Sequence, residues 1–334
     1  MRVLCRLIQM NWTMIGNRLT PLRSKPDPLT LKETRMGRHL VTSRVTAITA
    51  VAQLGFVTPV FAQSDEAIEA ARRVNISGRQ RMLSQRISKA ACFLNVGVST
   101  DGLPDQMGGA VALFESSLNA LIRGDENMGL GPEQNVEILL ALQQVTKDWN
   151  AFSRNFRMAT TNGFVPRPAL SGIDESGLQL LASMNRTVNK TASTYGDALP
   201  DMPLILSLTI DLAGRQRMFT QKAAKEFCLI DAGVEVAENR ERLAKTTQLF
   251  TLTLAALQSG MPGMVMAAPN DEIRAQLALV AEAWAGPKAA LEHAANGAEI
   301  NDTQRIAIVN AMEPVLVLMN TAVGMYEDAI PEPE

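Results

Sequence analysis

The sequence predicts an all-α fold, made of two tandem up-down four-helix bundles that are related by an internal pseudo-two-fold axis. Two observations lead to this prediction. The 334-residue chain is rich in Ala, Leu and Met and has only 4% aromatic residues, a composition that favours helices. In addition, one helical segment occurs twice, and each copy lies in the first of four helical segments. Such helices with short connections are typical of up-down bundles.

The repeated segment covers residues 76–94, ISGRQRMLSQRISKAACFL, and residues 212–230, LAGRQRMFTQKAAKEFCLI. Both copies contain Gly-Arg-Gln-Arg-Met. Three further identical pairs keep the same offset of 136: Gln85 with Gln221, Lys89 with Lys225, and Cys92 with Cys228. Apolar residues return at helical spacing and no proline interrupts either copy, so each copy is expected to form an amphipathic helix.

Clusters of glycine, proline and asparagine divide each half of the chain into four helical segments. The helices of the first half are expected at 65–98, 107–123, 133–157 and 174–198. Those of the second half are expected at 203–232, 236–259, 269–293 and 301–329. The repeat extends beyond the motif, because Trp149 matches Trp284 and Tyr195 matches Tyr326 at similar offsets. We therefore expect the first sensor-like repeat at 65–200 and the second at 201–331.

The number of helices determines how the two copies meet. After four helices the chain is back at the end where it began, so the fifth helix runs in the same direction as the first. The two motif helices can then lie side by side and parallel, with equivalent residues level. This is the symmetry of a homodimer within one chain. It places these residues opposite each other: Gly78 and Gly214, Arg81 and Arg217, Cys92 and Cys228.

Two arginines level with each other suggest an anion site. At about 6 Å and an effective dielectric near 20, Arg81 and Arg217 would repel each other by roughly 3 kcal/mol. An anion between them would accept charge-assisted hydrogen bonds from both, and the planar guanidinium suits nitrate, nitrite or a carboxylate. Gly78 and Gly214 would let the backbones approach the ligand. The other candidate ligand-binding residues are Met82 and Met218 as an apolar lid, and Gln85 and Gln221 as partners of the arginines.

Other interpretations of these residues remain open. Arg81 and Arg217 could instead pair with glutamates on neighbouring helices. Asn75 and Asp211 differ between the copies, and we interpret both as helix caps. The remaining basic residues of the motif are expected in solvent: Arg79, Arg86, Arg215 and Lys222.

Residues 1–62 are interpreted as an upstream extension followed by a secretory signal peptide. Basic residues at 35–44 precede an apolar run at 45–61, and a polar segment follows. The run is short for a membrane span, which favours a cleaved signal peptide. The alternative is an uncleaved leader that anchors the protein in the inner membrane. The true start is either Met1 or Met36.

Charge and cysteine usage agree with export to the periplasm. Residues 1–62 hold nine Lys or Arg and two Asp or Glu, a net charge of +7; the whole chain carries −2, which leaves −9 for the remainder. An acidic protein is a poor partner for nucleic acid. Disulfides persist outside the cytoplasm, so we expect a bridge between Cys92 and Cys228. Two small buried thiols are the alternative.

The segment from Asn75 to Arg86, NISGRQRMLSQR, resembles the signature of the N-terminal periplasmic domain of type IV pili methyl-accepting chemotaxis transducers (PilJ-like). It is also similar to the shorter motif of nitrate/nitrite sensor histidine kinases (NarX-like). Residues 211–222 are a second, divergent match. The resemblance implies a four-helix sensor domain that binds nitrate or nitrite at a dimer interface. The motif arginine that holds the ion corresponds by position to Arg81 and Arg217.

The chain also departs from those families. No second span, kinase or methylated coiled coil is expected after Ile330, so the resemblance implies a report to a separate, membrane-bound signalling protein. The kinase motif lacks Gly-Arg-Gln-Arg, which leaves the ligand's identity open. The alternative is a periplasmic structural or interaction protein without a small ligand.

Enzymatic activity is not expected. The histidines are His39 and His293, so neither a histidine metal cluster nor a Ser-His-Asp triad is expected. The sequence has no glycine-rich phosphate loop after a strand and no Glu-x-x-His pair. We therefore expect no catalytic residues, no metal and no cofactor.

Overall fold

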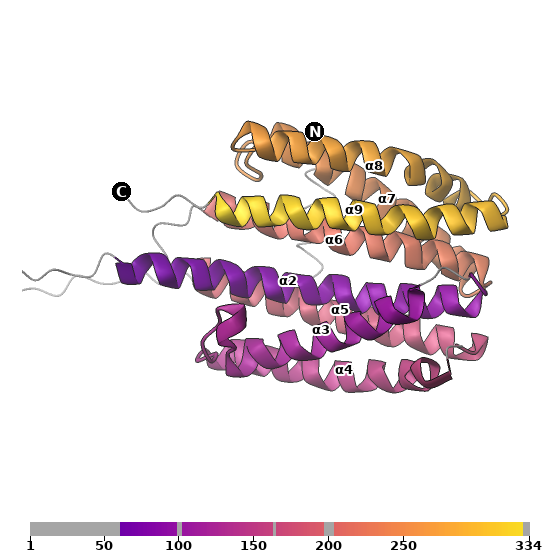
Figure 1. The fold of residues 1–334 in the computed structure, drawn as a ribbon, viewed down its shortest axis with the longest axis horizontal. Coiled ribbons are helices and arrows are strands. Elements are labelled where there is room, and N and C mark those ends of the chain that lie inside the picture. Colours follow the sequence, from indigo (N-terminus) through magenta and orange to yellow (C-terminus); the bar gives the residue numbers. More distant parts are fainter. Residues whose placement is uncertain (1–60, 99–101, 163–164, 197–203, 330–334) are drawn as a thin grey trace, which may run out of the picture. The chain divides into compact units, whose positions relative to one another are not determined.

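Helices make up most of the computed structural model, which describes residues 61–98, 102–162, 165–196 and 204–329 (Figure 1). Most of the expected signal peptide therefore lies outside the described residues. The first bundle contains α2 (Phe61–Asn95), α3 (Leu103–Arg123), a short 3-10 helix η1 (Glu126–Met128), α4 (Val136–Asn162) and α5 (Arg167–Gly196). The second contains α6 (Leu204–Asp231), α7 (Val236–Ser259), α8 (Asp271–Ala295) and α9 (Asp302–Asp328).

The helices pack in the order predicted for two up-down bundles. In the first bundle α2 contacts α3 and α5, and α4 closes the ring between them. In the second bundle α6 contacts α7 and α9, and α8 closes the ring. The most extensive contact of all joins α2 to α6, the two motif helices, which lie side by side in Figure 1. The predicted all-α fold of two bundles is confirmed, and both bundles belong to one compact unit, Val60–Glu334.

Most helix ends lie close to their predicted places, but α5 begins earlier than expected. The sequence predicts a break at residues 163–172, whereas α5 already starts at Arg167. Pro168 lies in its first turn, where the missing N–H of proline costs nothing. Gly172 is inside the helix, and its carbonyl accepts a hydrogen bond of 3.0 Å from Asn155 Nδ2 on α4. Helix α2 also starts earlier than predicted, so the proposed cut after Ala62 falls in its first turn.

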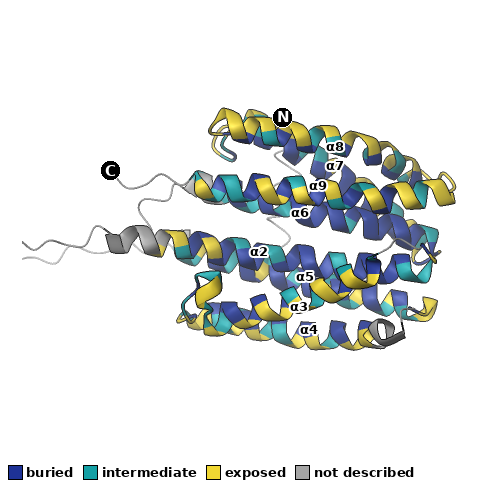
Figure 2. Cartoon of the chain, viewed as in Figure 1, coloured by how far each residue is buried: buried dark blue, intermediate teal, exposed yellow. Residues whose placement is uncertain are grey.

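The two bundles have matching aromatic cores. Phe114 stacks on Trp149 with ring centroids 4.1 Å apart, and Phe250 lies against Trp284 at 4.0 Å. These are equivalent pairs in the repeat. Figure 2 shows that α2 and α6 are buried along most of their length, because each motif helix contacts helices of its own bundle and the other motif helix. The motif therefore lies in the interior, not at the surface.

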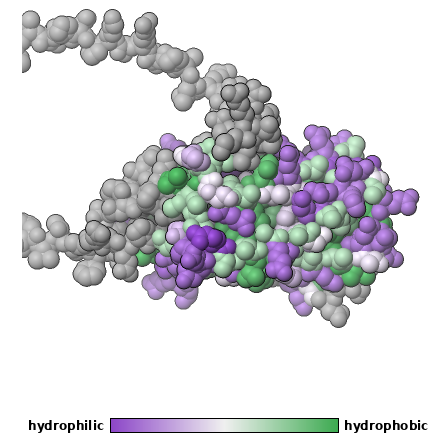
Figure 3. Space-filling model, turned by 90° about the horizontal axis from the view of Figure 1, so that it is seen from above, coloured by the Kyte–Doolittle hydropathy of each residue, from purple (hydrophilic) through white to green (hydrophobic). Residues whose placement is uncertain are grey.

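Helix α9 has the length and apolar composition of a membrane-crossing helix. It packs against α6 and α8. Its buried residues form one face inside the second bundle: Ile308, Val309, Met312, Val315, Leu316, Met319, Ala322, Val323 and Tyr326. That face accounts for much of its apolar character. On the side of the molecule seen in Figure 3, hydrophobic and hydrophilic residues are mixed, as is usual for a protein surface.

Candidate functional site

The two motif arginines converge where α2 and α6 meet. A Cβ placed on Gly78 would lie 3.2 Å from Nη2 of Arg81 and 3.9 Å from Nη2 of Arg217. A Cβ placed on Gly214 would lie 3.4 Å from Nη2 of Arg217 and 3.8 Å from Nη2 of Arg81. Arg81 is 0% exposed and Arg217 is 4% exposed. The absence of side chains at the two glycines thus makes room for two buried guanidinium groups in one place.

Each arginine hydrogen-bonds to a residue of the opposite motif helix. Nη2 of Arg81 donates to Oδ1 of Asp211 at 2.7 Å, and Nη2 of Arg217 donates to Oδ1 of Asn75 at 2.5 Å. Arg81 has two longer contacts, from Nη1 to Asn185 and from Nε to the carbonyl of Gly78, both 3.4 Å. These reciprocal contacts show the pseudo-two-fold relation between the two helices.

The interpretation of Asn75 and Asp211 as helix caps is wrong. Both residues lie well inside their helices, α2 (Phe61–Asn95) and α6 (Leu204–Asp231). They serve instead as side-chain acceptors across the interface. The sequence shows that Asn75 and Asp211 occupy equivalent positions. Their role as acceptors becomes apparent only from the contact between the two helices.

The expectation that the other basic residues lie in solvent is also wrong. Nη2 of Arg79 donates to Ser117 Oγ at 2.9 Å, and Arg86 pairs with Glu313 at 2.6 Å. Arg215 pairs with Asp211 at 2.7 Å, and Lys222 pairs with Glu226. The reason is that neighbouring helices cover the motif helices on several sides. A cation that is partly removed from water is stabilised by a hydrogen-bonding or charged partner.

The glutamines and methionines of the motif are buried. Nε2 of Gln85 donates to Ser84 and Nε2 of Gln221 donates to Thr220, both at 3.2 Å. Their carbonyl oxygens have no hydrogen-bond partner among the described residues. Met82 and Met218 belong to the hydrophobic core, with exposures of 3% and 6%. All four side chains lie inside the protein, and their role as ligand-binding residues stays a prediction.

Arg79, Arg81, Arg215 and Arg217 form an arginine cluster where α2 and α6 meet. Two carboxylates near this cluster have pKa values that are shifted in opposite directions. Burial would raise the pKa of Asp211, but Arg215 and Arg81 outweigh it and lower that pKa to about 2. Burial raises the pKa of Glu327, on α9, to about 7, although Arg217 opposes the rise. Burial lowers the pKa of Arg217 to about 10, against the effect of Glu327 and with that of Arg81. Two like charges and a low-dielectric surrounding make each buried cation harder to keep protonated.

Two buried lysines connect the bundles. Lys89 of α2 pairs with Glu313 of α9 at 2.6 Å, and Lys225 of α6 pairs with Asp174 of α5 at 2.5 Å. Each lysine thus reaches a helix of the other bundle. The two lysines are identical residues of the repeat, 136 positions apart. Their acidic partners, Glu313 and Asp174, do not have this spacing, so no pattern in the sequence identified them. The same is true of Glu327 and Asn185.

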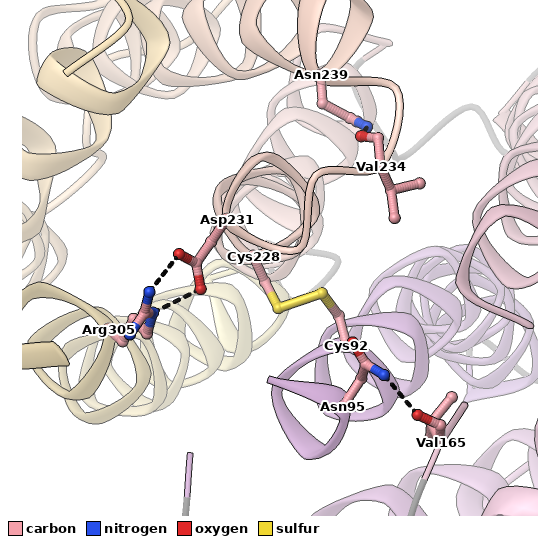
Figure 4. Close-up of a disulfide and its surroundings, with 8 residues drawn as sticks. All are labelled: Cys92, Asn95, Val165, Cys228, Asp231, Val234, Asn239 and Arg305. Carbon is pink, nitrogen blue, oxygen red and sulfur yellow. Dashed lines mark hydrogen bonds and ion pairs between the residues drawn. A yellow bond between two sulfur atoms is a disulfide. The ribbon is translucent and has the colours of Figure 1, made fainter. Parts of the chain in front are cut away.

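A disulfide between Cys92 and Cys228 cross-links α2 and α6, with Cα atoms 6.1 Å apart (Figure 4). Close to this disulfide, Arg305 donates hydrogen bonds of 2.6 and 2.8 Å to the carboxylate of Asp231, the last residue of α6. The bridge lies three turns along each helix from the arginines, at about 1.5 Å of rise per residue. It fixes the two motif helices in parallel and in register.

Comparison with known proteins agrees with this arrangement. The family model described as type IV pili methyl-accepting chemotaxis transducer N-term (PilJ) matches residues 63–168 and 206–308. The two matches cover corresponding parts of the two bundles and together more than half of the chain. No curated protein matches the sequence. The chain therefore belongs to the family of type IV pili methyl-accepting chemotaxis transducer N-terminal domains, and it carries two copies of that domain.

Proposed function

We propose that the protein is an exported, non-catalytic sensor module that holds a small oxyanion, nitrate or nitrite by preference, between α2 and α6. It would report to a membrane-bound chemosensory or two-component protein. Membership of a sensory family of chemotaxis transducers gives the signalling context. The proposed repeats are 65–200 and 201–331, so that each supplies one arginine. The observation that carries the proposal is the convergence of two buried arginines over two glycines.

The charge of the cluster supports an anionic ligand. Four arginines interact electrostatically there: Arg79, Arg81, Arg215 and Arg217. The carboxylates that offset them are Asp211 and Glu327. A buried charge without a counter-ion costs several kcal/mol. A bound monoanion would reduce the excess of positive charge, and anion binding at this site would therefore be electrostatically favourable.

The disulfide supports the proposed export. A bridge between two fully buried cysteines is typical of proteins from oxidising compartments, such as the periplasm. The acidic net charge of the chain after residue 62 makes nucleic acid an unsuitable partner.

An interaction protein without a small ligand is the second candidate. The disulfide and the lysine pairs between the bundles favour it, because they would lock the bundles together with or without an anion. The two candidates differ in one respect. Only the sensor requires an anion to stabilise the protein by mass action.

A thermal-shift and calorimetric titration with nitrate, nitrite and acetate separates the two candidates. We expect nitrate or nitrite to raise the melting temperature of the wild type and to release or absorb heat on binding. Arg217→Gln should remove both effects, whereas Arg274→Gln, at an exposed arginine of α8, should leave them. No shift with any of the three anions would leave the interaction protein as the better account.

A further inference from the structure

The two sides of the pseudo-two-fold axis differ at one acceptor. On the first side, the carboxylate of Asp211 lies between two guanidinium groups. Its Oδ1 accepts from Arg81 at 2.7 Å and its Oδ2 accepts from Nε of Arg215 at 2.8 Å. The arginines of this side are therefore joined by one planar anion that belongs to the chain itself.

On the second side, the equivalent acceptor is a neutral amide. Asn75 takes the place of Asp211, and Arg217 and Arg79 take the places of Arg81 and Arg215. Oδ1 of Asn75 accepts from Arg217 at 2.5 Å, while Arg79 turns to Ser117. The Nε atoms of Arg79 and Arg217 are buried and have no hydrogen-bond partner among the described residues. Within the part of the chain that the structure describes, no carboxylate accepts hydrogen bonds from both of these arginines as Asp211 does from the other two.

The carboxylate that faces the second side is Glu327. It interacts electrostatically with both Arg217 and Arg79, and its Oε1 is buried without a hydrogen-bond partner among the described residues. Asp328 on the same helix and Arg72 on α2 also act on Glu327 electrostatically, and the side chain of Asn75 hydrogen-bonds to it. Three polar atoms of this side, on Arg79, Arg217 and Glu327, thus lack the partner that buried polar atoms normally have.

We propose that the protein binds one small planar monoanion on the side of Arg217, with Arg217 and Arg79 as its ligands, while Asp211 fills the equivalent site as a built-in carboxylate. The proposal rests on the anion binding proposed above and adds the place and the number of the ligands. It makes the duplicated site asymmetric: one half is occupied permanently and the other is left for an external ligand.

The class of ligand follows from Asp211. Its two oxygens show what the arginines accept, namely a planar group that offers one oxygen to each guanidinium. Nitrate, nitrite and acetate have such oxygens. A dianion such as sulfate would bring a second negative charge next to Glu327, so the site should select a planar monoanion over sulfate.

The proposal is tested by replacing each of the two acceptors, Asn75 and Asp211, with the residue found at the equivalent position. Binding of nitrate, acetate and sulfate to the full chain is then measured by isothermal titration calorimetry. Asn75→Asp supplies a second built-in carboxylate and should weaken nitrate binding at least 100-fold. Asp211→Asn removes the first one and should raise the number of bound nitrates from one to two. In the wild type, one nitrate and no measurable sulfate should bind.

A second pair of variants serves if either exchange prevents folding. Arg79→Gln should weaken nitrate binding at least tenfold, and clearly more than Arg215→Gln at the equivalent position, because Arg215 is already paired with Asp211. Nitrate binding by Asn75→Asp with wild-type affinity, or equal effects of the two glutamine variants, overturns the inference alone. If neither the wild type nor Asp211→Asn binds any of the three anions, the proposed function fails together with the inference.

Discussion

Arg81 donates a hydrogen bond of 2.7 Å to Asp211 across the interface of the two motif helices. The equivalent contact, from Arg217 to Asn75, runs in the opposite direction between the same helices. The two contacts are geometrically related, but only the first is an ion pair. We therefore expect the two acceptors to contribute unequally to the stability of the protein.

Loss of Asp211 should cost far more stability than loss of Asn75. Asp211→Ala leaves the fully buried Arg81 without its carboxylate, and breaking a buried ion pair costs about 3–5 kcal/mol. Asn75→Ala removes a neutral acceptor, which costs about 1–3 kcal/mol. The free energy of unfolding in urea measures both. Equal losses would contradict the view that Asp211 is the main counter-ion of the cluster.

The disulfide should stabilise the folded protein strongly. It closes a loop with a sequence separation of 136, for which the chain-entropy estimate is about 5 kcal/mol. A variant with Cys92→Ser and Cys228→Ser should therefore unfold at lower urea concentration than the wild type. Protein purified from the periplasm should migrate differently on reducing and non-reducing gels. Free thiols in that protein would be the opposite result.

Glu327 should make stability depend on pH. Burial raises its pKa from the ordinary value of 4.5 to about 7 in the folded state, so the unfolded chain ionises first. Stability should be unaffected below about pH 4.5, fall between pH 4.5 and 7, and be level above that, by on the order of 3 kcal/mol at most. Glu327→Gln should lack this fall. The difference between the two urea unfolding curves, measured at each pH, isolates the effect from other groups.

The same carboxylate should make anion binding depend on pH. Below pH 7 Glu327 is mostly neutral and does not repel an anion at Arg217, whereas above pH 7 it is charged. We expect the Kd for nitrate to rise about tenfold, which is about 1.4 kcal/mol, between pH 6 and pH 8. Calorimetry with Glu327→Gln should give the same Kd at both. A wild-type Kd that falls with rising pH would show that Glu327 does not act on the ligand.

Much of the fold could be predicted because the chain repeats itself. The offset of 136 between Gly78 and Gly214 defined the two halves, and the even number of helices per half required the two motif helices to be parallel. Most clusters of glycine and proline lie at helix ends, but the cluster at 163–172 runs into α5, where Pro168 and Gly172 are accommodated inside the helix. Periodicity cannot tell a glycine that ends a helix from one that packs against a neighbour.

The site could be predicted only in part. The repeat pointed to Arg81 and Arg217, because both copies keep them. Residues that act on them from outside the repeat, such as Glu327 on α9 and Asn185 on α5, had no pattern in the sequence. The helical pattern of one segment places Arg79 and Arg215 in solvent, because it does not show that several neighbouring helices surround that segment. Their partial burial is a property of the packed bundles.

A crystal structure of the protein grown in nitrate tests the central claim most directly. We predict one planar ion that contacts Arg217 where α2 and α6 meet, with Asp211 still bound to Arg81. Well-ordered density for both arginines with no ion at either of them, in crystals of protein saturated with nitrate, would contradict it.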